Sequence, residues 1–126
     1  MRVFGVYGLH CEHDLHQTMM QAAFDYKGIS DSLYQSMSVS PMSFTGAVES
    51  ANQADFGGIN ILWPFQEYVT EIVDECSDLV NKAFCANMLV CSGGMISAFN
   101  TIGAGIMNAL TKEKNYSVKD KKVLLI

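Results

Sequence analysis

The sequence has few cations and no long apolar run, and each of these shortages excludes a class of protein. Only eight of the 126 residues are Lys or Arg, against thirteen Asp or Glu, so the formal net charge is −5. A surface that binds duplex nucleic acid needs many phosphate-neutralising cations, so we expect no nucleic-acid partner. No run approaches the ~18 apolar residues of a membrane-spanning helix. We therefore expect no membrane partner and a cytoplasmic location.

The sequence also lacks a C-x-x-C pair among its four cysteines. We expect reduced structural thiols rather than disulfides or a zinc site. Residues 10–16, His-Cys-Glu-His-Asp-Leu-His, are the densest group of metal-ligating types, but their spacing matches no standard zinc signature. We interpret them as a polar loop at the carboxyl end of the first strand, with a metal site as the weaker alternative. The cysteines are Cys11, Cys76, Cys85 and Cys91.

The residues that are present describe one globular domain of alternating strands and helices. At 13.9 kDa with 49% hydrophobic residues, the chain is long enough to bury a core. Periodicity and turn residues predict strands over 1–8, 32–39, 56–63, 86–91, 95–100 and 123–126. They predict helices over 18–27, 41–53 and 103–112, and one broken helix over 65–73 and 77–83. Strands that alternate with helices in this way indicate an α/β sheet built from crossover units, with one hairpin at residues 92–94.

Five blocks of this chain, in this order, resemble the shikimate dehydrogenase family. Residues 8–24 contain Gly8, His13 and Met19-x-x-Ala-Ala-Phe, where the family has a glycine, H-S-x-S-P and M-H-N-A-A-F. Residues 56–66, Phe-Gly-Gly-Ile-Asn-Ile-Leu-Trp-Pro-Phe-Gln, resemble its F-x-G-x-N-V-T-x-P-x-K block. Residues 86–88 fall on its A-V-N-T, residues 99–103 on its Y-N-T-D-G, and residues 119–126 on its G-K-x-V-L-x-x strand.

The resemblance implies that residues 1–126 are the substrate-binding domain of such an enzyme. The implied fold is an open three-layer α/β sandwich, with a mixed, mainly parallel six-stranded sheet and helices on both faces. Family members reduce 3-dehydroshikimate to shikimate with NADPH, in aromatic amino acid biosynthesis, and hold the cofactor in a following Rossmann domain. The sequence stops where the glycine-rich loop of that domain would begin. We therefore expect NADP as the family's cofactor, but no dinucleotide site in this chain alone.

The resemblance also implies a substrate site, which departs from the family's pattern. Two serine hydroxyls that bind the substrate carboxylate in the family fall here on Asp14 and His16. The Asp14 carboxylate would repel an acidic ligand unless a protonated His16 offsets it. Asn60, Asn87 and Thr101 keep neutral groups that can bind hydroxyls, whereas Leu62 replaces a threonine of the family. The implied substrate-binding positions are Asp14, His16, Asn60, Leu62, Asn87 and Thr101.

The family's catalytic lysine and aspartate fall on Gln66 and Ile102. Hydride transfer to a carbonyl leaves an alkoxide that needs a proton, and neither of these side chains exchanges one near neutral pH. Losing a general acid–base group costs ~10²–10⁴-fold in rate. Two interpretations follow: a catalytically impaired oxidoreductase half that binds a hydroxy acid such as shikimate or quinate, or a non-catalytic sensor or interaction module for such a ligand. Both interpretations are compatible with a homodimer.

Overall fold

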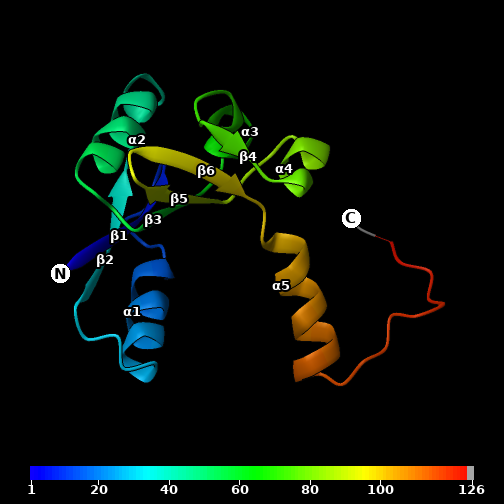
Figure 1. Ribbon diagram of the computed structural model, residues 1–126. Coiled ribbons are helices and arrows are strands. Elements are labelled where there is room, and N and C mark those ends of the chain that lie inside the picture. The colour runs from blue at the N-terminus through cyan, green and yellow to red at the C-terminus, as the bar shows by residue number, and fades with distance from the viewer. Residues whose placement is uncertain (125–126) are drawn as a thin grey trace.

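The computed structural model describes residues 1–124 and is built around one six-stranded sheet (Figure 1). The strands lie in the order β2-β1-β3-β5-β6-β4. β1 pairs in parallel with both β2 and β3, and β4 pairs in parallel with β6, whereas β5 is antiparallel to β3 and β6. The sheet is therefore mixed, as the resemblance implies. The strands are β1 (Arg2–Gly8), β2 (Ser32–Ser38), β3 (Gly58–Ile61), β4 (Glu75–Cys76), β5 (Met88–Ser92) and β6 (Met95–Phe99).

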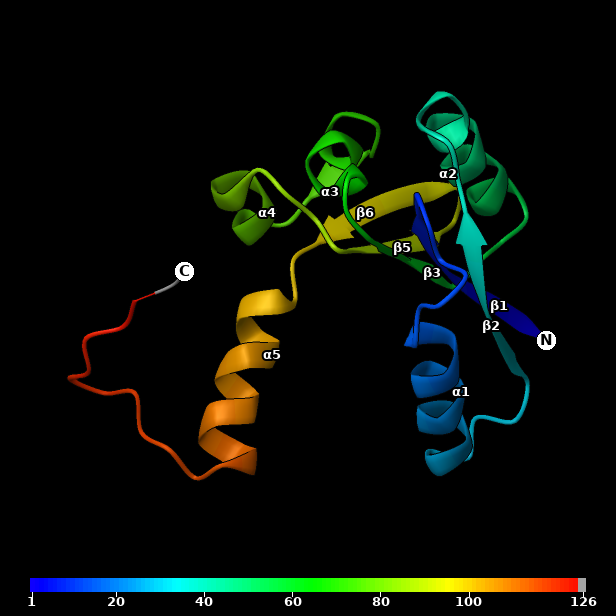
Figure 2. The ribbon, with the colours of Figure 1, turned by 180° about the vertical axis from the view of Figure 1, so that it is seen from behind.

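Helices cover both faces of the sheet, which confirms the three-layer arrangement (Figures 1 and 2). α2, α3 and α4 lie on one face, α1 packs on the other, and α5 projects away from the sheet on the side of α1. A 3-10 turn at Pro41–Ser43 leads into α2, and another at Val69–Glu71 continues α3. A π-helical turn at Ala109–Glu113 continues α5. The helices are α1 (His16–Tyr26), α2 (Phe44–Gln53), α3 (Phe65–Tyr68), α4 (Asp78–Ala83) and α5 (Ile102–Asn108).

The hydrophobic core lies between the sheet and α2, α3 and α4. In α2, the apolar residues at helical spacing turn one face towards the strands, and Phe44 and Val48 are fully buried. Phe44 stacks on Phe65 of α3, with 4.1 Å between ring centroids. Ile59 and Leu89 meet these side chains from β3 and β5. Each such side chain stabilises the fold by about 1.5–3 kcal/mol relative to exposure, so this face holds the domain together.

The opposite face of the sheet is covered less completely. α1 packs on β1 and β2 but buries none of its residues fully. On the β5 and β6 half of this face, Val90, Met95 and Phe99 are 37%, 47% and 38% exposed. The predicted site residues lie on this face or at the strand ends beside it.

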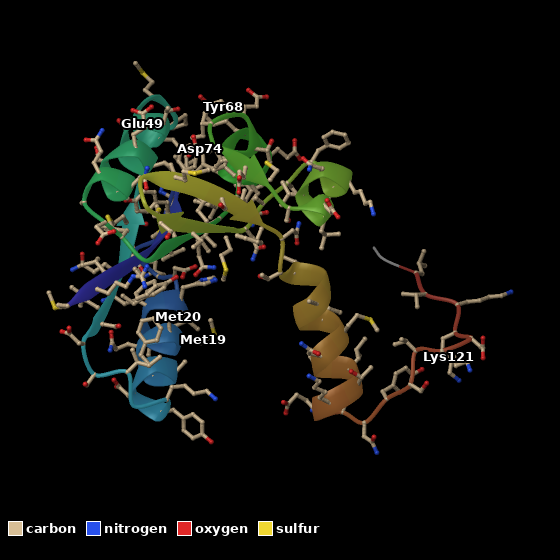
Figure 3. All side chains as sticks on the ribbon, in the orientation of Figure 1. Met19, Met20, Glu49, Tyr68, Asp74 and Lys121 are labelled. Atoms are coloured by element: carbon tan, nitrogen blue, oxygen red, sulfur yellow. The ribbon has the colours of Figure 1, made fainter. Side chains whose placement is uncertain are left out.

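The structure corrects the broken helix predicted over residues 65–73 and 77–83: α3 with its 3-10 turn and α4 are its two helical parts, and a short strand forms the break between them. Glu75 and Cys76 form β4, which adds to the edge of the sheet next to β6. Asp74 holds the start of β4 at two points: its N–H donates to the carbonyl of Ile96 at 3.0 Å, and its Oδ2 accepts the N–H of Ile96 at 2.7 Å. Figure 3 shows Asp74 beside β6. Partners on a strand about 20 residues away therefore override the local helical pattern.

The predicted strand over residues 123–126 is not found in the part that the structure describes. Val123 and Leu124 have no strand conformation and are 72% and 82% exposed, and residues 125–126 lie outside the described residues. An apolar run becomes a strand only where a neighbouring strand supplies its hydrogen bonds. After α5 the chain turns back beside that helix but stays apart from the sheet (Figures 1 and 2), so residues 123–124 meet no such neighbour.

Candidate functional site

Four residues are linked by a series of hydrogen bonds at the carboxyl end of β3, and we call them the polar chain: Tyr34, Asn60, Asn87 and Thr101. The hydroxyl of Tyr34 donates to Oδ1 of Asn60 at 2.7 Å. Nδ2 of Asn60 donates to the backbone carbonyl of Asn87 at 3.3 Å. Nδ2 of Asn87 donates to Oγ1 of Thr101 at 2.9 Å, and Oδ1 of Asn87 accepts the N–H of Thr101 at 2.7 Å. The structure thus brings together three of the predicted substrate-binding residues.

The sheet topology explains why these residues meet. Asn60 lies in β3 opposite Met88 of β5, so Asn87 comes next to the end of β3. Thr101 follows β6, which returns antiparallel to β5, and it directly precedes α5. Three segments far apart in the sequence therefore place neutral donors and acceptors at one end of the sheet, where open α/β folds bind ligands.

The polar chain keeps unused hydrogen-bonding capacity. A carboxamide offers two hydrogens and two oxygen lone pairs, and the bonds above use only part of this for Asn60 and Asn87. The Thr101 hydroxyl accepts from Asn87, which leaves its own hydrogen free to donate. A ligand bearing hydroxyl groups could therefore be bound without breaking the existing bonds.

Tyr34 is a member of this site that sequence reasoning missed. Its side chain is only 2% exposed, although it comes from β2, at the edge of the sheet. Burial, together with the negative charge of Asp14, raises the pKa of Tyr34 well above its usual range. The phenol therefore stays neutral at physiological pH and acts as the donor to Asn60. A single tyrosine in an alternating strand carries no signal that would mark it out.

Asp14 and His16 form a pair at the start of α1. Oδ1 of Asp14 accepts the backbone N–H of His16 at 2.7 Å and lies 2.6 Å from Nδ1 of its ring. Because a carboxylate can only accept, the ring carries a proton on Nδ1. The Asp14 and His16 side chains are 18% and 34% exposed, so solvent and ligands can still reach the pair. The pair lies at the start of α1, and α1 packs on the face of the sheet that carries Tyr34 and Asn60.

Gln66 is tied to the backbone that surrounds it. Nε2 of Gln66 donates to the carbonyl of Ile61, the last residue of β3, at 2.9 Å, and the backbone carbonyl of Gln66 accepts the N–H of Ala86 at 2.7 Å. Between β3 and α3 the chain turns through a cis peptide bond at Trp63–Pro64. The side chain therefore fastens α3 to the end of β3, and its amide offers a hydrogen bond but no transferable proton.

Ile102 and Leu62 bring apolar groups to the predicted site. Ile102 begins α5 and is 44% exposed, and its N–H donates to Oδ1 of Asn100 at 3.1 Å. Leu62 follows β3 and lies against Gly8, where an added Cβ would come within 3.1 Å of it. Neither side chain can exchange a proton or bind a hydroxyl group. Their neighbourhood is accordingly more apolar than the polar chain beside it.

Neither a metal cluster nor a membrane span is found in the described part of the chain. Residues 1–124 contain no group of three or more His, Cys, Asp or Glu side chains placed to hold one metal ion, and their four cysteines are free. None of their helices is both long enough and apolar enough to cross a bilayer.

Comparison with known proteins agrees with this architecture. The profile of the family described as the shikimate dehydrogenase substrate binding domain matches residues 6–89. Shikimate dehydrogenase (NADP(+)) of Methanopyrus kandleri is 32% identical over 124 residues, which are 98% of this chain and 42% of that protein. The enzyme of the same name from Geobacillus kaustophilus is 28% identical over 125 residues, which are 99% of this chain and 45% of that protein. The chain thus spans less than half the length of these relatives.

A solved structure supports the fold independently. Shikimate 5-dehydrogenase from Thermus thermophilus, in complex with shikimate, superposes with a TM-score of 0.88 over 96% of this chain and 46% of that one. The two are 23% identical, so this likeness concerns the fold alone. The profile match, in contrast, covers two thirds of the sequence and includes the end of β1, all of β3 and the positions of Asp14, Asn60 and Asn87. By sequence and by fold, the chain belongs to the shikimate dehydrogenase substrate-binding domain family.

Proposed function

We propose that the chain binds a small hydroxylated ring acid of the shikimate or quinate type, as the substrate-binding part of a shikimate dehydrogenase-like oxidoreductase. The observation that carries the proposal is the polar chain: neutral donors and acceptors from Asn60, Asn87 and Thr101 gather at the end of β3 in a domain of this family. Groups of this kind suit the vicinal hydroxyls of such a ring. NADP would be bound by polypeptide beyond these 126 residues.

The proposed enzyme is impaired in its proton transfer. The two positions where the family has a lysine and an aspartate carry Gln66, whose amide is bonded to the Ile61 carbonyl, and Ile102, which is apolar. Reduction of a carbonyl needs a proton donor beside the new hydroxyl, and neither group supplies one. A water molecule could deliver the proton, but the reaction would then lack the ~10²–10⁴-fold rate enhancement that a positioned acid–base group gives.

The same two residues favour a second candidate function, a non-catalytic sensor for the same class of ligand. A site with hydroxyl-binding groups can bind the ligand, but without a proton-transfer group it cannot convert the ligand efficiently. Under this alternative the chain binds the acid but converts nothing when a nucleotide-binding domain is supplied. If the chain binds no such ligand, a structural or interaction role remains.

Calorimetric titration of shikimate and quinate into the 126-residue chain tests the binding proposal. We expect saturable binding, and an affinity at least about tenfold lower for Asn60→Ala, because a half-buried hydrogen-bonding group is lost. Asn108→Ala, at the exposed end of α5, is the matched control and should bind as the unchanged chain does. Absence of binding at millimolar ligand in the unchanged chain would refute the proposal.

A fusion of residues 1–126 to the remainder of the Geobacillus kaustophilus relative separates enzyme from sensor. We expect NADP-dependent oxidation of shikimate by the fusion to be very slow, and Gln66→Lys alone to change this little while Ile102 lacks a carboxylate. The double variant Gln66→Lys with Ile102→Asp should raise the rate by about 10²-fold or more. Fast turnover by the unchanged fusion would contradict the proposed impairment, and binding with no turnover even in the double variant would favour the sensor.

A further inference from the structure

A cavity of about 150 Å³ lies under α1, on the face of the sheet that the core helices do not cover. Its lining comes from β1, α1, β2, β3 and β5, and includes Phe4, Met20, Phe24 and Val90. Figure 3 shows Met20 on α1 below the sheet. At the back of the cavity Tyr34 is 2% exposed, whereas Val90 of β5 is 37% exposed, so the cavity opens beside β5.

The lining is aromatic and uncharged. Phe4 and Phe24 lie 5.2 Å apart between ring centroids, and Phe24 and Tyr34 lie 6.4 Å apart in an edge-to-face arrangement. The lining includes no Asp, Glu, Lys, Arg or His among the described residues. A charged ligand would lose its hydration there without gaining a partner, so the chemistry of the cavity selects neutral, apolar groups.

One polar position interrupts this lining, where the cavity reaches the polar chain. Oδ1 of Asn60 accepts the Tyr34 hydroxyl and has a second lone pair, and Nδ2 has a second hydrogen beyond the one given to Asn87. A neutral ligand could therefore place a single hydroxyl group against the Asn60 amide. Most of the remaining side chains of the lining are apolar or aromatic.

We propose that this cavity is a binding site for a neutral single-ring aromatic compound that carries one hydroxyl group, a ligand of the phenol class. The volume suits one ring, because an apolar protein cavity of about this size stays dry and binds benzene. Edge and face contacts with Phe4, Phe24 and Tyr34 would hold the ring. The hydroxyl group would bond to Asn60. The site does not depend on the proposed function, although both use Asn60.

Titration of phenol into the ¹⁵N-labelled and methyl-labelled chain, followed by NMR, tests the proposal. We expect saturable shifts in residues of β3 and β5 and in the Met20 methyl group, with a dissociation constant of about 1 mM for a ligand of this size. Nuclear Overhauser effects should join the ring protons of phenol to Met20 and Phe24. Benzene, without the hydroxyl group, should bind several-fold more weakly, and benzoate, which is charged, should not bind measurably.

Two variants on the same face of the sheet supply the control. Val90→Phe narrows the opening and should weaken phenol binding at least about tenfold. Met95→Phe adds a ring at an exposed position of β6 that does not line the cavity, and it should leave the affinity unchanged. Shifts that stay linear in phenol concentration, equal affinity for phenol and benzoate, or equal loss in both variants would each overturn the proposal. The result is independent of whether shikimate binds.

Discussion

Asn87 and Thr101 hold each other through two reciprocal hydrogen bonds. Nδ2 of Asn87 donates to Oγ1 of Thr101 at 2.9 Å, and the N–H of Thr101 donates to Oδ1 of Asn87 at 2.7 Å. Asn87 directly precedes β5 and Thr101 directly precedes α5, so the pair fixes where α5 leaves the sheet. The same pair supplies two of the three neutral groups in the proposed substrate site.

Substitutions of Asn87 and Thr101 should lower the free energy of unfolding non-additively, because both residues take part in the same two hydrogen bonds. Asn87→Ala removes both bonds and should reduce the free energy of unfolding by about 1–2 kcal/mol, since each net hydrogen bond contributes about 1 kcal/mol. Thr101→Ala should cost about 1 kcal/mol alone and almost nothing in the Asn87→Ala background, which a double-mutant cycle in urea would measure. Thr111→Ala, whose hydroxyl donates to the Met107 carbonyl, is the control that should add independently. Full additivity of the first two changes would contradict the proposed coupling.

Asp14→Asn should strengthen binding of an acidic ligand. The amide keeps an oxygen to accept the His16 N–H but removes the negative charge. Two like charges about 4 Å apart cost about 1 kcal/mol in water and about 4 kcal/mol at an effective dielectric constant of about 20. We therefore expect shikimate to bind the variant about tenfold more tightly or better, as measured by calorimetry.

The methyl ester of shikimate is the control for that prediction. Because the ester is neutral, Asp14→Asn should leave its affinity nearly unchanged, and Asp25→Asn, an exposed change on α1, should affect neither ligand. An equal gain for acid and ester would show that the effect of Asp14 is steric rather than electrostatic.

Two glycine-to-alanine changes should have opposite effects on stability. At Gly58 of β3 an added Cβ would come within 2.7 Å of the Leu89 carbonyl oxygen, which belongs to the backbone of β5 and cannot move away easily. Gly58→Ala should therefore cost about 1–3 kcal/mol. At Gly46 in α2 nothing lies within 4 Å, so Gly46→Ala should stabilise the fold by about 0.5–1 kcal/mol through helix propensity. Urea denaturation of both variants checks the pair, and a stable Gly58→Ala protein would contradict the close approach of β3 and β5.

The buried phenol of Tyr34 should make the fold sensitive to alkaline pH. Burial, with the charges of Asp14 and Cys11, raises the folded-state pKa of Tyr34 above the value of about 10 for an exposed tyrosine. Below pH ~10 both states are protonated and nothing is lost. Above it the unfolded chain releases the proton and the folded chain does not, so the free energy of unfolding falls by up to about 1.4 kcal/mol per pH unit, until the folded-state pKa is passed.

Urea denaturation at about pH 9, 10 and 11 would measure this slope. Tyr7, Cys11 and Cys91 also have raised pKa values, chiefly from burial, so part of the slope remains in any single variant. Tyr34→Phe should reduce the slope above pH ~10, whereas Tyr26→Phe, at a side chain that is 87% exposed, should not. An unchanged slope in Tyr34→Phe would show that this phenol does not resist ionisation in the fold.

Most of the elements and the class of the fold can be predicted from residue order, because they depend on neighbours along the chain. Gly93 and Gly94 mark the hairpin between β5 and β6, and both adopt the left-handed φ values, 60° and 82°, that glycine permits without strain. In α2 the helical spacing of Phe44, Val48 and Ala51 predicts the face that the structure buries. The resemblance to a family also depends only on residue order.

Features whose partners are distant in sequence depend on the tertiary fold. β4 exists because Asp74 bonds to Ile96, and the run at residues 123–126 forms no strand up to residue 124 because no strand lies beside it. The hydrogen bond from Tyr34 to Asn60 joins residues 26 positions apart, on β2 and β3, and it forms only because the sheet places both strands beside β1. The backbone carbonyl of Gln66 likewise accepts the N–H of Ala86, a residue about 20 positions later in the chain. Hydrophobic periodicity reports the conformational preferences of neighbouring residues, whereas these contacts form only when segments distant in sequence pack together.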